Sequence, residues 1–105
     1  MNVDLQELMA VQVLQRSYED LNAHDITTAL QAANVPGTTV TTIHDPDGAV
    51  VEACCIEVYV LLDPQRHALS VHCCHPHNAD PYKTLTAPTL NDAITLVTTE
   101  FGHQP

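Results

Sequence analysis

Basic residues are scarce in this sequence: Arg16, Arg66 and Lys83 are the only three among its 105 residues. Thirteen aspartates and glutamates oppose them, so the formal net charge is −10 with histidine neutral. Nucleic-acid binding needs lysines and arginines that neutralise phosphates, and anionic membrane surfaces repel a negatively charged protein. The composition therefore excludes direct binding to nucleic acid and argues against membrane attachment.

Catalytic and phosphate-binding motifs are also missing. The chain contains no GxGxxG, GxxxxGK[ST], HExxH, CxxC or GxSxG pattern. Two serines and three glycines leave little material for a phosphate-binding loop or an oxyanion loop. We therefore expect a protein that is not an enzyme and that holds no cofactor.

Signals for export are absent as well. Asp4 and Glu7 lie where a signal peptide would carry positive charge, and no apolar run reaches membrane-spanning length. The four cysteines form two adjacent pairs, which is not the dispersed spacing of a secreted disulfide scaffold. These features predict a cytoplasmic protein with free thiols.

Apolar residues make up 45% of the chain, which is enough to form one hydrophobic core. A chain of this length forms a single domain, here residues 1–105. The hydrophobic pattern predicts an α+β fold with two N-terminal helices, a three-stranded antiparallel β-meander and a C-terminal helix. The expected order is α-α-β-β-β-α.

Helical spacing of apolar residues occurs in three segments. The first spans residues 3–22, and its apolar face consists of Leu8, Val11, Leu14, Tyr18 and Leu21. The second begins with Asp25 as N-cap and ends at Val35-Pro36-Gly37, because proline cannot continue a helix. The third follows Thr89, which resembles a capping box with Asp92, and ends at Gly102.

Between these helices the period changes to that of strands. The expected strands are Thr38–His44, Ala49–Leu62 and His67–His75, joined by turns at Asp45–Gly48 and Asp63–Arg66. Ala49–Leu62 is apolar on both faces and is expected in the middle, with the threonine-rich strand outside. Residues 76–88 carry three prolines and are expected to form a loop, with a short edge strand around Tyr82–Thr86 as the alternative.

The cysteines and histidines of the second and third strands suggest a candidate metal site. A two-residue loop at Pro64-Gln65 would place Cys55 opposite Cys74 and Glu57 opposite His72. Neighbouring residues of a strand point to opposite faces, so neither vicinal cysteine pair could chelate one ion. A zinc site would therefore combine Cys55, His72 and Cys74, with Glu57 or His77 as fourth ligand.

Two other interpretations use the same residues. A catalytic thiol beside His72 or His75 would need an orienting group and an oxyanion hole, and the sequence specifies neither. Packed thiols beside surface histidines require nothing further. The unusual ligand spacing, without any CxxC, favours these packed thiols over zinc.

The charge balance favours a non-catalytic module that binds another protein. A negative field accelerates encounter with a basic surface, and basic surfaces in the cytosol are commonly nucleic-acid-binding ones. In size, acidity and lack of catalytic motifs the chain resembles small phage inhibitors such as anti-CRISPR or anti-restriction proteins. The carboxylates expected to contact the partner are Glu19, Asp20, Asp45, Asp47, Asp63 and Asp80.

Two alternatives to the protein-binding hypothesis remain open at this point. The chain could be a zinc- or thiol-site protein, or its acidity could serve only solubility. Self-association is expected if the helices leave one face of the central strand uncovered. The patch would then consist of Val51, Ala53, Tyr59 and Leu61.

Overall fold

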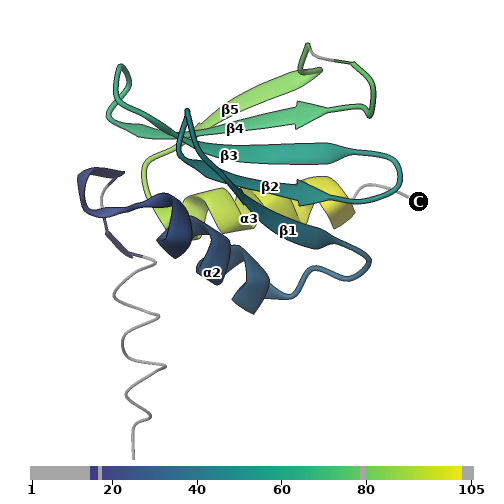
Figure 1. Cartoon of the computed structure of the whole chain (residues 1–105), viewed down its shortest axis with the longest axis horizontal. Coiled ribbons are helices and arrows are strands. Elements are labelled where there is room, and N and C mark those ends of the chain that lie inside the picture. The colour runs from purple at the N-terminus through teal and green to yellow at the C-terminus, as the bar shows by residue number, and fades with distance from the viewer. Residues whose placement is uncertain (1–14, 17, 79, 103–105) are drawn as a thin grey trace, which may run out of the picture.

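The computed structural model describes residues 15, 16, 18–78 and 80–102. Within this part of the chain, five antiparallel strands form one sheet, and helices α2 and α3 pack side by side on one of its faces (Figure 1). The prediction of three strands behind two N-terminal helices is therefore wrong. The α+β class is confirmed.

The strand order follows the chain order, so each strand pairs with the next one. Consecutive turns consequently alternate between the two ends of the sheet. The turns β1–β2 and β3–β4 lie at one end, and the connections β2–β3 and β4–β5 lie at the other (Figure 1). The elements are η1 (Tyr18–Asp20), α2 (Ala23–Ala33), β1 (Thr39–Ile43), β2 (Gly48–Glu52), β3 (Glu57–Asp63), β4 (Ala68–Cys74), β5 (Lys83–Ala87) and α3 (Leu90–Gly102).

The first predicted helix, residues 3–22, lies mostly outside the described residues. Its described end is a single 3₁₀ turn, η1, in which the Leu21 amide donates to the Tyr18 carbonyl at 3.2 Å. Helix α2 then starts three residues earlier than predicted, since its N-cap is Asn22 and not Asp25. Asn22 is its N-cap and Asp25 completes a capping box, each side chain accepting from the other residue's amide.

The long apolar segment Ala49–Leu62 is two strands rather than one. It reverses at Cys54-Cys55, and the Ala53 amide donates to the Ile56 carbonyl at 3.0 Å across the turn. Strands β2 and β3 then pair along their length, with Val51 opposite Val58. The reversal makes β3 the central strand. The threonine-rich strand is β1, and it lies at the edge of the sheet as expected.

The predicted register between the next two strands is wrong by two residues. Asp63 pairs with Ala68 across a four-residue turn, and not with Arg66 across two. The carboxylate of Asp63 accepts from the amides of Gln65 and Arg66, at 3.1 and 3.3 Å, and this local bonding stabilises the wider turn. A shift of two residues leaves each side chain on its predicted face.

The alternative of a short edge strand in the proline-containing loop is correct. Strand β5 pairs with β4 along five residues, with Leu69 opposite Ala87 and Cys73 opposite Lys83. The C-terminal helix α3 follows as predicted, and the Asp92 amide donates to the Thr89 hydroxyl at 3.2 Å. Lys83 and Tyr82 both bond the buried carboxylate of Glu100, so β5 is tied to the last turns of α3.

The core lies between the sheet and the two helices. It consists of one face of the sheet with the apolar stripes of α2 and α3: Ile26, Leu30, Ala49, Val51, Ile56, Val58, Val60, Leu69, Val71, Cys73, Leu90, Ala93 and Val97. None of the helices in the described ranges is long and apolar enough to span a bilayer.

The opposite face of the sheet carries Tyr59 and Leu61, which are half-buried and which no described helix covers. The reversal at Cys54-Cys55 moves Val51 to the helix-covered face, where it is buried. The four-residue patch expected for self-association therefore does not exist as one surface. Association of two copies stays a prediction.

Candidate acidic binding site

Five of the six carboxylates predicted to contact a partner lie at the same end of the sheet. The β1–β2 turn contributes Asp45 and Asp47, the β3–β4 turn follows Asp63, and η1 contributes Glu19 and Asp20. We call this region the acidic end. Asp80 lies in the β4–β5 connection at the opposite end, so the structure does not bring it together with the others (Figure 1).

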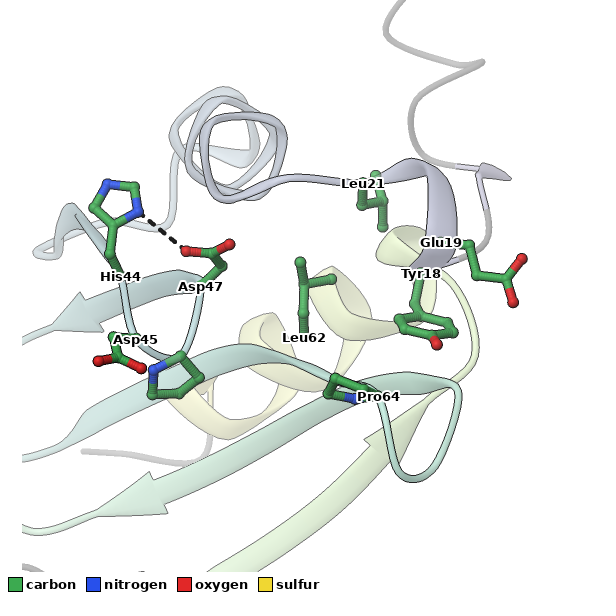
Figure 2. A pocket seen from close by; sticks show the side chains of 9 residues that line it. Tyr18, Glu19, Leu21, His44, Asp45, Asp47, Leu62 and Pro64 are labelled. Atoms are coloured by element: carbon green, nitrogen blue, oxygen red, sulfur yellow. Dashed lines mark hydrogen bonds and ion pairs between the residues drawn. The ribbon is translucent and has the colours of Figure 1, made fainter.

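A hollow of about 770 Å³ separates η1 from the two turns. Figure 2 shows Leu62 near its centre, whereas the carboxylates of Glu19 and Asp45 point outward at its edges. The site thus has an apolar floor and a charged rim. The lining residues are Tyr18, Glu19, Leu21, His44, Asp45, Pro46, Asp47, Leu62 and Pro64.

Hydrogen bonds to β3 and within the turn hold the β1–β2 turn in place. The Leu62 amide donates to the Asp47 carbonyl at 3.0 Å, which fixes the turn against β3. Asp45 has a φ of 58°, a left-handed conformation that aspartate adopts more readily than most residues. The carboxylate of Asp47 lies 3.1 Å from His44 Nδ1, and both side chains are more than half exposed. Both aspartates are therefore presented to solvent on a fixed backbone.

On the β3–β4 turn, the carboxylate of Asp63 has several partners. Its Oδ2 accepts from the Ser70 hydroxyl at 2.8 Å and lies 3.7 Å from Arg66 Nε. The Ser70 hydrogen bond, with the two turn amides and the Arg66 charge, lowers the pKa of Asp63 below its ordinary value, against a smaller opposing effect of burial. Asp63 consequently stays ionised through the neutral and mildly acidic range.

The third element of the acidic end, η1, is anchored to the β3–β4 turn by aromatic groups. The Tyr18 hydroxyl and His67 Nδ1 are 3.0 Å apart, and the two rings meet edge to face. Glu19 lies 3.9 Å from the same imidazole nitrogen. His67 therefore anchors η1 beside the hollow. No sequence motif joins residues 18 and 67.

The hydrogen bond from Ser70 to Asp63 is expected to stabilise the fold against acid unfolding. A folded-state pKa that lies below the unfolded value gives stability that is present above the unfolded pKa and lost as pH falls through the folded pKa. Ser70→Ala removes the largest cause of the lowered pKa of Asp63. We therefore expect acid unfolding to begin at a higher pH, measured by circular dichroism, and the Asp63 carboxyl to titrate at a higher pH by NMR.

The matched control for this prediction is Asp63→Asn, which has no carboxyl to titrate. Adding Ser70→Ala to Asp63→Asn is expected to leave the onset of acid unfolding where the single Asp63→Asn variant has it. A shift of equal size in both backgrounds would show that Ser70 acts on acid stability through some other group.

The candidate metal ligands are not brought together. Cys74 lies opposite Glu57 and His72 opposite Tyr59, whereas Cys55 lies outside the strands in the β2–β3 turn. In the part of the chain that the structure describes, no three histidine, cysteine, aspartate or glutamate side chains are grouped to hold a metal ion.

The buried thiols on β4 are also poorly suited to be ligands or nucleophiles. Burial raises the pKa of the Cys73 thiol to about 11. Burial, and then the charges of Glu57 and Asp80, raise the pKa of Cys74 as well. A metal ligand or a catalytic thiol must lose its proton, so these shifts favour packed thiols.

Comparisons with protein-family models, with curated proteins and with solved structures find no match to this chain.

Proposed function

We propose that this chain is a small, non-catalytic, cytoplasmic module that binds a basic surface of another protein through its acidic end. The observation that carries the proposal is the gathering of Glu19, Asp20, Asp45, Asp47 and Asp63 at one end of the sheet. Three of them, Glu19, Asp45 and Asp47, line one hollow. Clustered carboxylates produce a stronger local field than the same charges spread over the surface. The described cations near this end include Arg66 and, when protonated, His44 and His67, and Arg16, which precedes η1 by two residues, lies 3.7 Å from Asp25.

The floor of the hollow supports the proposal because charge alone gives little affinity. Protein interfaces combine an apolar centre, which excludes water, with a polar rim that steers the approach. Leu21, Leu62 and Tyr18 supply the centre here, and the carboxylates supply the rim. A lysine or arginine stem of the partner would pack on this floor while its charged head reaches Asp45 or Asp47.

The partner's basic surface is proposed to be one that binds nucleic acid. Lysine and arginine gather on proteins chiefly where phosphates must be neutralised. A protein that occupies such a surface competes with the nucleic acid, so the chain would act as an inhibitor of the anti-CRISPR or anti-restriction kind.

The first test removes two charges from the β1–β2 turn. Asp45→Asn with Asp47→Asn is expected to slow association with the partner by about 3- to 10-fold at low salt, because long-range attraction governs encounter. The difference should disappear at high salt, where exposed charges are screened. Thermal stability should change little, since both side chains are exposed and asparagine tolerates left-handed φ.

The matched control removes two charges from the opposite end of the sheet. Glu52→Gln with Asp80→Asn makes the same change in net charge, and both residues are exposed. The partner is first captured from a nuclease-treated lysate, and association rates of the three proteins are then measured at two salt concentrations. Equal slowing by both double variants would mean that net charge acts without any acidic site.

The inhibitor role has its own measurement. The captured partner is mixed with labelled nucleic acid, and the chain is added while fluorescence anisotropy is recorded. We expect the nucleic acid to be displaced by the wild type and by the Glu52→Gln/Asp80→Asn control, and displaced less by the Asp45→Asn/Asp47→Asn variant. Simultaneous binding of the chain and the nucleic acid would contradict competition.

A further inference from the structure

The chain contains the dipeptide Cys-Cys twice, and the two copies have different local structures. Cys73-Cys74 lies within β4, where neighbours alternate between the faces of the sheet. Cys73 is fully buried among the core residues, and Cys74 lies on the other face, 6% exposed. The two side chains of this pair therefore point away from each other, as expected for a regular strand.

Cys54-Cys55 is instead the two-residue loop of the β2–β3 hairpin. Glu52 pairs with Glu57, and the Ala53 amide bonds the Ile56 carbonyl, so the chain reverses between these residues. The alternation rule does not apply where the chain reverses. The two Sγ atoms lie 3.0 Å apart, and both residues are exposed. The expectation that neither vicinal pair can converge is thus wrong for this one.

We propose that Cys54 and Cys55 form a reversible redox-modification site, in which thiol–disulfide exchange with a small disulfide such as glutathione disulfide closes an intramolecular bond. The sulfurs need to approach by only about 1 Å to reach the disulfide bond length of about 2.05 Å. Both thiols can be reached from solvent. This site lies at the end of the sheet opposite the acidic end and does not depend on the proposed function.

The exchange proceeds in two displacements. The Cys54 thiolate attacks one sulfur of glutathione disulfide, whose S–S bond breaks and releases one glutathione thiolate. Cys55 then loses its proton to solvent, and its sulfur attacks Cys54 Sγ, displacing the second glutathione. The pair has lost two electrons and two protons, and one glutathione disulfide has become two glutathione thiols.

The closeness of the two sulfurs means that only one of the thiols loses its proton at a time. The hydrogen bond to the Cys54 sulfur, and then the charge of a Cys54 thiolate, raise the pKa of Cys55. Two thiolates at this separation would repel each other, so one proton is retained. The pair therefore reacts through one thiolate at a time, and we assign the attack to Cys54 and the resolution to Cys55.

The closed form should be easily reduced. Adjacent Cα atoms are about 3.8 Å apart across a trans peptide, which is below the usual disulfide range of about 4.4–6.8 Å. A disulfide outside this range is strained, and strained exposed disulfides have the higher potentials typical of reversible sites. A disulfide with a structural role would instead need a low reduction potential, so that it resists reduction.

The test uses the whole reduced chain in buffers that contain glutathione and glutathione disulfide. After acid quenching and alkylation of free thiols, mass spectrometry of the intact protein and of its peptides locates each modification. We expect the wild type to lose two hydrogens at Cys54-Cys55 when glutathione disulfide predominates, and to regain them when glutathione predominates. Cys73 and Cys74 should remain free thiols throughout.

Two variants separate the steps. Cys55→Ser lacks the resolving thiol and is expected to accumulate a glutathione adduct on Cys54. Cys74→Ser changes the other pair and is expected to behave as the wild type. Unfolding in guanidinium should lower the ratio of disulfide to glutathione adduct severalfold, because the hairpin no longer holds the sulfurs together.

Three results would overturn the proposal. The first is a lasting glutathione adduct on the wild type, which would show that Cys55 does not resolve. The second is a disulfide that forms at Cys73-Cys74 instead. The third is an equal ratio of disulfide to adduct in the folded and unfolded chain, which would show that the hairpin contributes nothing.

Discussion

Gly48→Ala is expected to lower the free energy of unfolding by about 3 kcal/mol, the top of the usual range for overpacking. Gly48 begins β2 and is buried opposite Leu61. A Cβ built on it would lie 3.0 Å from Leu61 Cα and closer still to the carbonyl oxygen of Val60. Both contacts are with backbone, so neither can be relieved by turning a side chain.

The measurement is chemical and thermal unfolding followed by circular dichroism, with Gly102→Ala as control. A Cβ built at Gly102, the last residue of α3, would meet no described atom within 4 Å apart from the adjacent backbone, so we expect that substitution to be nearly neutral. Gly48→Ala should also weaken partner binding, because the strand that it disturbs positions Asp45 and Asp47. Wild-type stability of Gly48→Ala would mean that β2 and β3 are not as close as described.

Ile56→Ala is expected to cost about 2–5 kcal/mol, the range for truncating a buried isoleucine to alanine. Ile56 is 1% exposed and is the residue that returns the chain from the cysteine turn into the core. Its removal leaves a cavity beneath the hairpin that carries Cys54 and Cys55.

Urea unfolding of Ile56→Ala and Ile56→Val tests this packing. The valine variant deletes one methylene and should lose only about 0.5–1.5 kcal/mol. Both variants should keep the wild-type dependence of free energy on urea, since the surface exposed on unfolding hardly changes. Equal losses for valine and alanine would show that the side chain does not fill a close-packed site.

Some elements could be predicted because their signals are local. Helix α3 begins at a Thr89–Asp92 cap and carries an apolar stripe at helical spacing. The strand near residues 68–74 and the edge position of the threonine-rich strand follow from alternation and from side-chain type. Each of these predictions needs only a few consecutive residues.

The turn at Cys54-Cys55 could not be predicted because it carries none of the usual turn residues. Glycine, proline, asparagine and aspartate are absent between Ala49 and Leu62, so the segment has the composition of one long strand. The pairing of β2 with β3 stabilises the reversal from outside the turn. This is tertiary structure overriding a local preference.

That single missed turn also hid the acidic end. In a three-stranded meander, the turn with Asp45 and Asp47 and the turn after Asp63 would lie at opposite ends of the sheet. The additional reversal places both at one end and sends Asp80 to the other. The candidate carboxylates could therefore be chosen from the sequence as exposed turn residues, but which of them act together depends on the number of strands.

The alternation of turns places the acidic end and the exposed thiols of Cys54 and Cys55 at opposite ends of the sheet. A thiol-reactive solid support would react with Cys54 or Cys55 in the β2–β3 turn, because Cys73 and Cys74 are buried. Molecules attached in this way would all stand with Asp45 and Asp47 facing the solution. The exposed thiols would therefore allow oriented immobilisation on a biosensor surface, without an added tag and without modification of any carboxylate.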